Sequence, residues 1–186
     1  MKIVNKNWIF SKLKLSLQTS SSVSSTVKSI IKDVKENGDK AVLKYVKKFE
    51  NSKASFKNIK LSKQDLKRAY DSISKKDKGA LKLAYKRIHH YHNKQRKTSY
   101  SYKDQLDTKF HIQWNPIDNV GLYIPGGLAS YPSTVLMTAI PAKIANVPNI
   151  MLCVPSKNGI TSNLTLAAAH LCGVDHVYNI GGAQAI

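Results

Sequence analysis

The sequence predicts an α/β fold, in which a basic helical N-terminal segment precedes an incomplete parallel βαβαβ unit. Charge divides the 186 residues in two: residues 1–110 hold 28 of the 30 Lys and Arg residues and nine of the 11 Asp and Glu residues. Residues 111–186 hold two of each and all six prolines. Apolar residues recur at helical spacing in the first part and gather in short runs between turns in the second. Two kinds of structure are therefore expected to join near residue 115.

The first part begins with two predicted helices separated by Gly38, which stands where a helix stop is expected. Before this glycine an apolar stripe recurs at spacings of three and four, and it comprises Val23, Val27, Ile30, Ile31 and Val34. After it, a second stripe comprises Val42, Tyr45, Val46 and Phe49. The lysines fall between the stripes, and we interpret them as solvated faces.

Two further helices are predicted from their start signals. Ser62 followed by Asp65 has the spacing of a capping box, and the apolar residues after it are Leu66, Ala69, Tyr70 and Ile73. Ser74 followed by Asp77 starts the next helix, whose inward residues are Leu81, Ala84, Tyr85, Ile88 and either Tyr91 or His92. Both helices belong to the basic part of the chain.

The second part changes from helical to strand periodicity. Phe110, Ile112 and Trp114 alternate as in a strand, which Asn115-Pro116 ends. Strands are predicted next at 120–124, 149–154 and 176–180, with helices at about 132–145 and at 164–172 between them. Pro132 suits the first turn of a helix, and Gly173 suits a helix end. This alternation predicts right-handed crossovers and a Rossmann-like parallel sheet.

We predict two domains, the first at residues 1–115 and the second at residues 116–186. The first is a basic helical segment that belongs to a larger α/β domain, and the second is an incomplete nucleotide-binding α/β domain. A parallel strand that ends in Gly181-Gly182 normally leads into another helix, yet four residues follow it. Such an arrangement leaves one face of the sheet uncovered. The sequence is therefore expected to be the front portion of a longer protein.

Composition excludes several classes of protein. Two cysteines cannot form a disulfide framework, and the proline-interrupted charge-free stretch is unsuited to cross a membrane. The first residues lack the features of a secretory signal, so a cytoplasmic location is expected. A net charge of +19 attracts nucleic acid, but 27 of the 30 basic residues are lysine. Because arginine is preferred for bidentate contacts with phosphates and bases, specific nucleic-acid binding is disfavoured.

Two glycine-rich turns at predicted strand ends are the candidate binding residues. The first carries Tyr123, Pro125, Gly126 and Gly127, and the second carries Gly181, Gly182 and Gln184. In open parallel sheets ligands bind at the carboxyl ends of the strands, and glycines let the backbone approach them closely. Tyr123 suits stacking on a base, and the amide of Gln184 suits a ribose or a carboxamide. The alternative is that both are simple tight turns, since neither has the full dinucleotide-binding spacing.

Other chemistry-bearing residues carry weaker signals. His89, His90 and His92 form a cluster, but no Cys or Asp completes a metal site and the nearby lysines would repel a cation. His170 and Cys172 are two residues apart and point to different faces of a helix, so packing is the better interpretation. No Ser-His-Asp triad, paired-carboxylate or P-loop pattern emerges from the sequence.

Three runs of sequence resemble histidinol dehydrogenases. Residues 119–143 (NVGLYIPGGLASYPSTVLMTAIPAK) are similar to the signature region of that family, and residues 166–175 and 179–186 match it in the right order. Residues 34–41 with Tyr45 and Phe49 resemble its N-terminal segment more loosely. One departure is Asn146, where the family commonly has glycine. Asparagine is the next-best residue for a left-handed helix end.

The resemblance implies an enzyme that oxidises L-histidinol through an aldehyde to L-histidine, as a homodimer with NAD and zinc. It carries the family's NAD contacts over to Tyr123 and Gln184. The family's zinc ligands, its catalytic Glu-His pair and a third NAD contact have no counterpart among residues 1–186. The resemblance therefore assigns no catalytic residue and no metal ligand to this chain, which is expected to be inactive alone. A non-catalytic remnant or interaction module remains an alternative, as does a basic nucleic-acid-binding protein.

Overall fold

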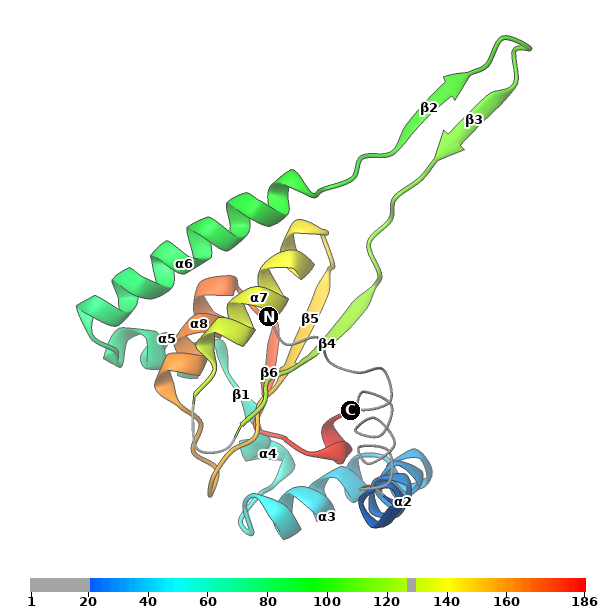
Figure 1. Cartoon of the computed structure of the whole chain (residues 1–186). Helices are drawn as coiled ribbons and strands as arrows, with labels where there is room; N and C mark the ends of the chain where they lie inside the picture. Colours follow the sequence, from blue (N-terminus) through cyan, green and yellow to red (C-terminus); the bar gives the residue numbers. More distant parts are fainter. Residues whose placement is uncertain (1–20, 127–129) are drawn as a thin grey trace, which may run out of the picture.

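A four-stranded mixed sheet forms the centre of the computed structural model, which describes residues 21–126 and 130–186 (Figure 1). Its order is β1-β6-β5-β4. Three of the strands are parallel: β4 (Asn119–Tyr123), β5 (Asn149–Cys153) and β6 (His176–Tyr178). The short β1 (Lys60–Leu61) pairs antiparallel with β6 at one edge. The predicted α/β class with a parallel unit is confirmed, whereas β1 was missed.

Two crossover helices lie on one face of this sheet, α7 (Pro132–Ile144) and α8 (Asn163–Cys172). Successive strands step across the sheet in one direction, so right-handed crossovers bring both helices to the same side (Figure 1). Pro132 occupies the first turn of α7, and Gly173 ends α8 in the left-handed conformation, as predicted. Asn146 is also left-handed, with a φ of 60°.

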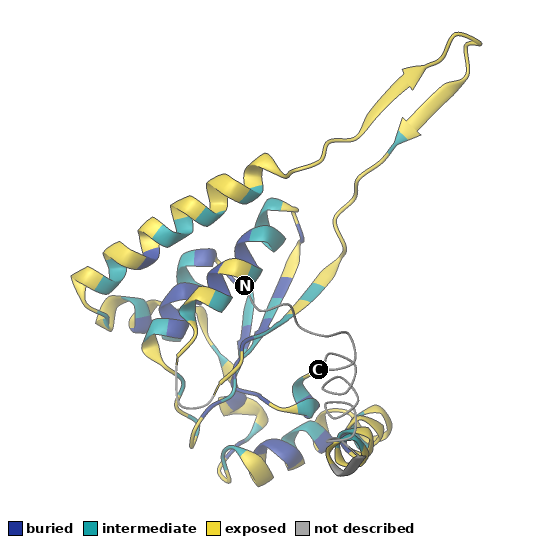
Figure 2. Cartoon of the chain, viewed as in Figure 1, coloured by how far each residue is buried: buried dark blue, intermediate teal, exposed yellow. Residues whose placement is uncertain are grey.

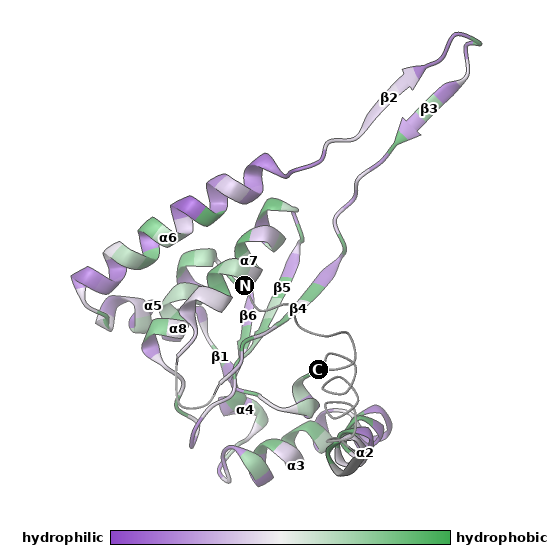
Figure 3. Cartoon of the chain, in the orientation of Figure 1, coloured by the Kyte–Doolittle hydropathy of each residue, from purple (hydrophilic) through white to green (hydrophobic). Residues whose placement is uncertain are grey.

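Two helices from the basic part cover α7 and α8. α5 (Lys63–Ser72) packs on α8, and α6 (Lys75–Lys94) packs on α7. Their predicted N-caps are confirmed, because Ser62 Oγ accepts from Asp65 N at 3.1 Å and Ser74 Oγ from Asp77 N at 3.0 Å. In Figure 3 the hydrophilic colour dominates α6, whereas α7 and α8 carry more apolar residues.

The main core lies between the sheet and these helices. Its innermost side chains from the second part of the chain are Ile124, Val135, Leu136, Ile140, Ile150, Leu152 and Val177. The first part adds Leu66, Ala69 and Leu81. The domain division at residue 115 stays a prediction, although residues from both sides of it share this core. On the opposite face of the sheet, Met151 and Cys153 are half-buried.

A smaller helical group packs at the carboxyl end of the sheet. It comprises α2 (Ser21–Asn37), α3 (Asp39–Phe49) and α4 (Phe56–Ile59). Gly38 separates α2 from α3 with a φ of 56°, which confirms the predicted break. The turn η1 (Ala183–Ala185) follows β6 and contacts α2 and α3. The predicted strand at 176–180 therefore ends earlier, at Tyr178, where the chain turns toward the helical group.

A two-stranded hairpin projects from the body of the molecule (Figure 1). It pairs β2 (Tyr100–Lys103) with β3 (Lys109–Ile112), and nearly all of it is exposed (Figure 2). The predicted strand at Phe110 and Ile112 is confirmed, but Trp114 lies outside it. The hairpin partner β2 was not predicted.

Candidate functional site

The carboxyl ends of β4, β5 and β6 carry three turns that lie against one another. Main-chain hydrogen bonds extend the sheet by one residue on two strands, since Ile124 N donates to Cys153 O and Val154 N donates to Tyr178 O, each at 2.9 Å. The chain leaves the sheet directly after these residues. Both glycine-rich turns predicted from the sequence are therefore at the same end of the sheet.

Pro155 packs between the two glycine turns. A Cβ atom built on Gly126 would lie 2.7 Å from Pro155 Cβ, and one built on Gly181 would lie 2.5 Å from Pro155 Cγ. Both separations are shorter than any side chain tolerates, so glycine is required at each position for this packing. Gly127, the remaining glycine of the first predicted turn, lies outside the described residues.

Tyr123 and Gln184 are brought to the same cluster through Gly182. Tyr123 Oη accepts a hydrogen bond from Gly182 N at 3.1 Å. Gly182 has a φ of 66° and a ψ of −170°, a conformation open essentially to glycine alone. The side chain of Gln184 folds back over this glycine, because a Cβ there would lie 2.8 Å from Gln184 Oε1. Tyr123 is half-buried, whereas Gln184 is only 6% exposed.

Glu50, at the end of α3, joins this cluster and was missed by the sequence analysis. Its Oε1 accepts from Gly181 N at 2.8 Å and from Gln184 Nε2 at 3.3 Å, while its Oε2 accepts from Ser156 N at 3.0 Å. The partners are more than 100 residues away along the chain. In the sequence, Glu50 looks like an ordinary solvent-exposed residue at the end of an amphipathic helix. No local pattern therefore identifies it as part of a binding site.

A cleft of about 900 Å³ opens beside these turns. Its lining includes Glu50, Tyr123, Pro125, Gly126 and Gly182, with residues 154–158 and 160–162 on another side. Gln184 does not line this cleft, and its side-chain amide donates to Glu50 Oε1. The predicted residues in the described part of the chain therefore lie in one cluster. Tyr123 lines the cleft, whereas Gln184 does not.

Two features of the cleft are suited to an anionic, hydrogen-bonding ligand. Ser156 is 7% exposed, and its Oγ has no hydrogen-bond partner in the described part of the chain. The N-termini of α7 and α8 open onto the cleft at Tyr131 and Ser162, and neither has a side-chain cap within the described residues. Free amides at a helix N-terminus attract negative charge.

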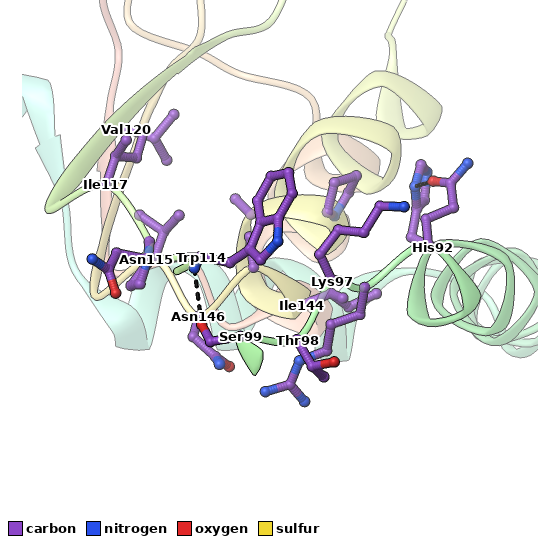
Figure 4. A pocket seen from close by; sticks show the side chains of 17 residues that line it. His92, Lys97, Thr98, Ser99, Trp114, Asn115, Ile117, Val120, Ile144 and Asn146 are labelled. Carbon is purple, nitrogen blue, oxygen red and sulfur yellow. Dashed lines mark hydrogen bonds between the residues drawn. The ribbon is translucent and has the colours of Figure 1, made fainter. Parts of the chain in front are cut away.

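A second hollow lies at the opposite ends of the strands. It measures about 730 Å³ and is lined by apolar side chains that include Trp114, Ile117, Val120 and Ile144 (Figure 4). Trp114 N donates to Ser99 Oγ at 2.9 Å beside it. None of the predicted site residues lines this hollow.

Comparisons with known proteins agree with the geometry. The family model for histidinol dehydrogenase matches residues 13–186. The chain belongs to the histidinol dehydrogenase family. The enzyme of that name from Acinetobacter baylyi is 45% identical over 162 residues, which are 87% of this chain and 38% of the relative. The one from Aromatoleum aromaticum is 46% identical over 158 residues, 84% of this chain and 36% of the relative.

A solved structure confirms the fold of this family member. The crystal structure of histidinol dehydrogenase from Elizabethkingia anophelis has a TM-score of 0.81 and 33% identity over 90% of this chain. The match covers 39% of that structure's chain. This sequence thus spans less than two fifths of the length of these relatives, in their N-terminal part.

The weaker candidate residues lie on α6 and α8, and none of them lines this cleft. His89 stacks on Tyr85 with ring centroids 5.8 Å apart, and His170 lies 5.2 Å from Tyr70. Burial raises the pKa of the Cys172 thiol to about 12. Within residues 21–126 and 130–186, no three His, Cys, Asp or Glu side chains are placed to hold a metal ion. No helix in that same part is long and apolar enough to cross a bilayer.

Proposed function

We propose that this chain forms the dinucleotide-binding part of an NAD- and zinc-dependent histidinol dehydrogenase. The parent reaction would oxidise L-histidinol to L-histidine through histidinal, in a cytoplasmic homodimer. Family membership supports the reaction, and the cleft at the carboxyl ends of β4, β5 and β6 supports the cofactor. The observation that carries the proposal is the convergence of Tyr123, Ser156 and the glycine turns on this one cleft.

Several residues of the cleft fit parts of a dinucleotide. The ring of Tyr123 offers a surface for stacking, and the free hydroxyl of Ser156 offers a hydrogen bond that nothing in the described chain satisfies. The uncapped N-termini of α7 and α8 would face the pyrophosphate, with Lys157 on the lining. When bound, NAD would supply the acceptor for a hydride.

The described residues fit a dinucleotide but do not form a site that could hold a zinc ion. The family resemblance assigns its zinc ligands and its Glu-His pair to no position in residues 1–186, and the described residues hold no three-ligand cluster. The chain is expected to bind NAD weakly and to leave histidinol unoxidised.

A binding titration with a matched control tests this function. We would measure NAD⁺ affinity by calorimetry for the native chain, for Tyr123→Ala and for Tyr102→Ala, whose tyrosine is exposed on the hairpin. The proposal predicts that only Tyr123→Ala loses binding. Equal binding by all three, or no binding by the native chain, would count against it. NADH formation from histidinol, NAD⁺ and Zn²⁺ by the native chain would refute the expected inactivity.

A further inference from the structure

The projecting hairpin has one apolar face and one polar face. Its register pairs Tyr100 with Ile112 and Tyr102 with Phe110, and residues opposite each other on antiparallel strands share a face. The rings of Tyr102 and Phe110 stack with centroids 5.1 Å apart, and the Tyr100 ring lies 6.4 Å from that of Tyr102. Together these four residues form the aromatic face. The opposite face carries polar side chains, which are Ser101, Lys103, Lys109 and His111.

The aromatic face is open to solvent, although its residues are typical of a covered sheet. Tyr100, Tyr102 and Phe110 are 54%, 50% and 41% exposed. Figures 1 and 2 show that the hairpin extends away from the body of the molecule. A two-stranded hairpin is at best marginally stable by itself, and it gains stability when its apolar face is covered. This face therefore has the character of an interaction surface.

Charge along the hairpin favours a second copy of this chain as the partner. The aromatic face is uncharged, whereas the whole chain has a net charge of +19 and would attract a polyanion to its lysine-rich helices instead. At the tip, residues 104–108 hold two Asp and no Lys or Arg. At the base, residues 94–97 hold three Lys or Arg and no Asp or Glu. Both segments are exposed, so antiparallel hairpins would place the acidic tip of each copy against the basic base of the other.

We propose that the aromatic face is a homodimer contact, in which the hairpins of two copies pack face to face and antiparallel about a two-fold axis. This inference rests on the homodimer of the proposed function and names the surface that forms it. Such a contact is self-complementary and closes after two copies. It buries stacked aromatic rings, and tyrosine is among the residues that contribute most at protein interfaces.

Charges placed on each face of the hairpin test this contact. Tyr102→Glu and Tyr102→Lys each put two like charges into one buried contact, so the dimer dissociation constant measured by sedimentation should rise about tenfold or more. An equimolar mixture of the two variants puts opposite charges there and should dimerise again. Ser101→Glu and Ser101→Lys are the matched controls, because Ser101 precedes Tyr102 on the polar face. Both controls should dimerise as the native chain does.

Isotope-filtered NMR on a mixture of labelled and unlabelled native chain needs no substitution. It therefore decides the question even if the Tyr102 variants fail to form the hairpin. Antiparallel packing predicts nuclear Overhauser contacts between Leu106, at the tip of one copy, and Trp114, at the base of the other. These contacts, or loss of the dimer in the Tyr102 variants with recovery in their mixture, support the proposal.

Several results would overturn the proposal. They are a native chain that stays monomeric at NMR concentrations, folded Tyr102 variants that dimerise like their Ser101 controls, a mixture that does not recover, and a native dimer without intermolecular contacts at the hairpin. NAD⁺ affinity is measured on the same samples and should not change in the Tyr102 variants, because the cleft lies at the other ends of the strands. Failure of the native chain to bind NAD⁺ would remove the proposed cofactor site and leave the dimer measurements as they are.

Discussion

The hydroxyl oxygen of Tyr123 accepts a hydrogen bond from the backbone N–H of Gly182 at 3.1 Å. This contact joins the end of β4 to the turn after β6, across the turn that follows β5. It uses a backbone donor at a glycine whose φ of 66° other residues rarely adopt. The side chain of Tyr123 and the turn at Gly182 therefore lie together in the lining of the cleft.

Removing this hydroxyl should loosen the turn without unfolding the protein. Tyr123→Phe keeps the ring but leaves Gly182 N–H to bond with water, so the free energy of unfolding should fall by about 1 kcal/mol or less. Hydrogen exchange measured by NMR should show faster exchange at Gly182 and native exchange in the core strands. The same change at exposed Tyr102 serves as the control, and equal effects of the two variants would contradict this role.

The glycines that contact Pro155 should not tolerate a methyl group. Gly181→Ala would place a Cβ 2.5 Å from the proline ring and Gly126→Ala one at 2.7 Å, so each should lower the free energy of unfolding by about 1–3 kcal/mol. Both should also weaken binding in the cleft, because the two turns must separate. Chemical denaturation measures the stability of each variant.

Gly79→Ala is the matched control for these variants. Gly79 lies in α6, where a Cβ would meet nothing within 4 Å. Alanine there should raise the stability by roughly 0.5–1 kcal/mol, since glycine weakens helix interiors. If all three alanines changed stability alike, the close contact with Pro155 would not be what requires glycine.

Neither cysteine should behave as a nucleophile in the folded chain. Burial raises the pKa of Cys172 to about 12, and burial followed by the charge of Glu50 raises the pKa of Cys153. At neutral pH both thiols stay protonated, so a thiol-labelling reagent should react slowly with the native protein and rapidly after denaturation. Fast labelling of Cys172 in the native state would show that its environment is more open than described.

The start of α5 should carry a pH-dependent share of the stability. Hydrogen bonds from Ser62, with help from Arg68, lower the pKa of Asp65 to about 2. Because the pKa of Asp65 is lower in the folded chain than its ordinary value of 3.8, the ionised carboxylate stabilises the fold at any pH above about 3.8. That stabilisation is lost as the pH falls toward 2. Asp65→Asn should therefore cost about 0.5–1 kcal/mol at neutral pH and progressively less in acid. A cost that stayed constant across this range of pH would contradict the assignment.

Local signals were enough to predict most of the elements. Ser62 and Ser74 identified helix starts, Gly38 and Gly173 identified helix ends, and short apolar runs identified the parallel strands. Each of these features acts within a few residues of its own position. The placement of Tyr123 and Gln184 in one cluster also followed from a general rule about the ends of parallel strands.

Long-range contacts were not predictable in the same way. Glu50 bonds with residues more than 100 positions away, and β1 owes its existence as a strand to the open edge of β6. The hairpin is a different case. Tyr100 and Tyr102 alternate as strand residues do, and that signal could have identified β2 before the structure was known.

The most direct test of the account is an NMR titration of the chain with NAD⁺. If the cleft beside β4, β5 and β6 binds the dinucleotide, the backbone amides of Gly126, Ser156, Gly181 and Gly182 should shift together with one affinity. The indole of Trp114, in the hollow at the other ends of the strands, should not move. Shifts confined to Trp114 and its neighbours, or no shifts at any NAD⁺ concentration, would contradict the account.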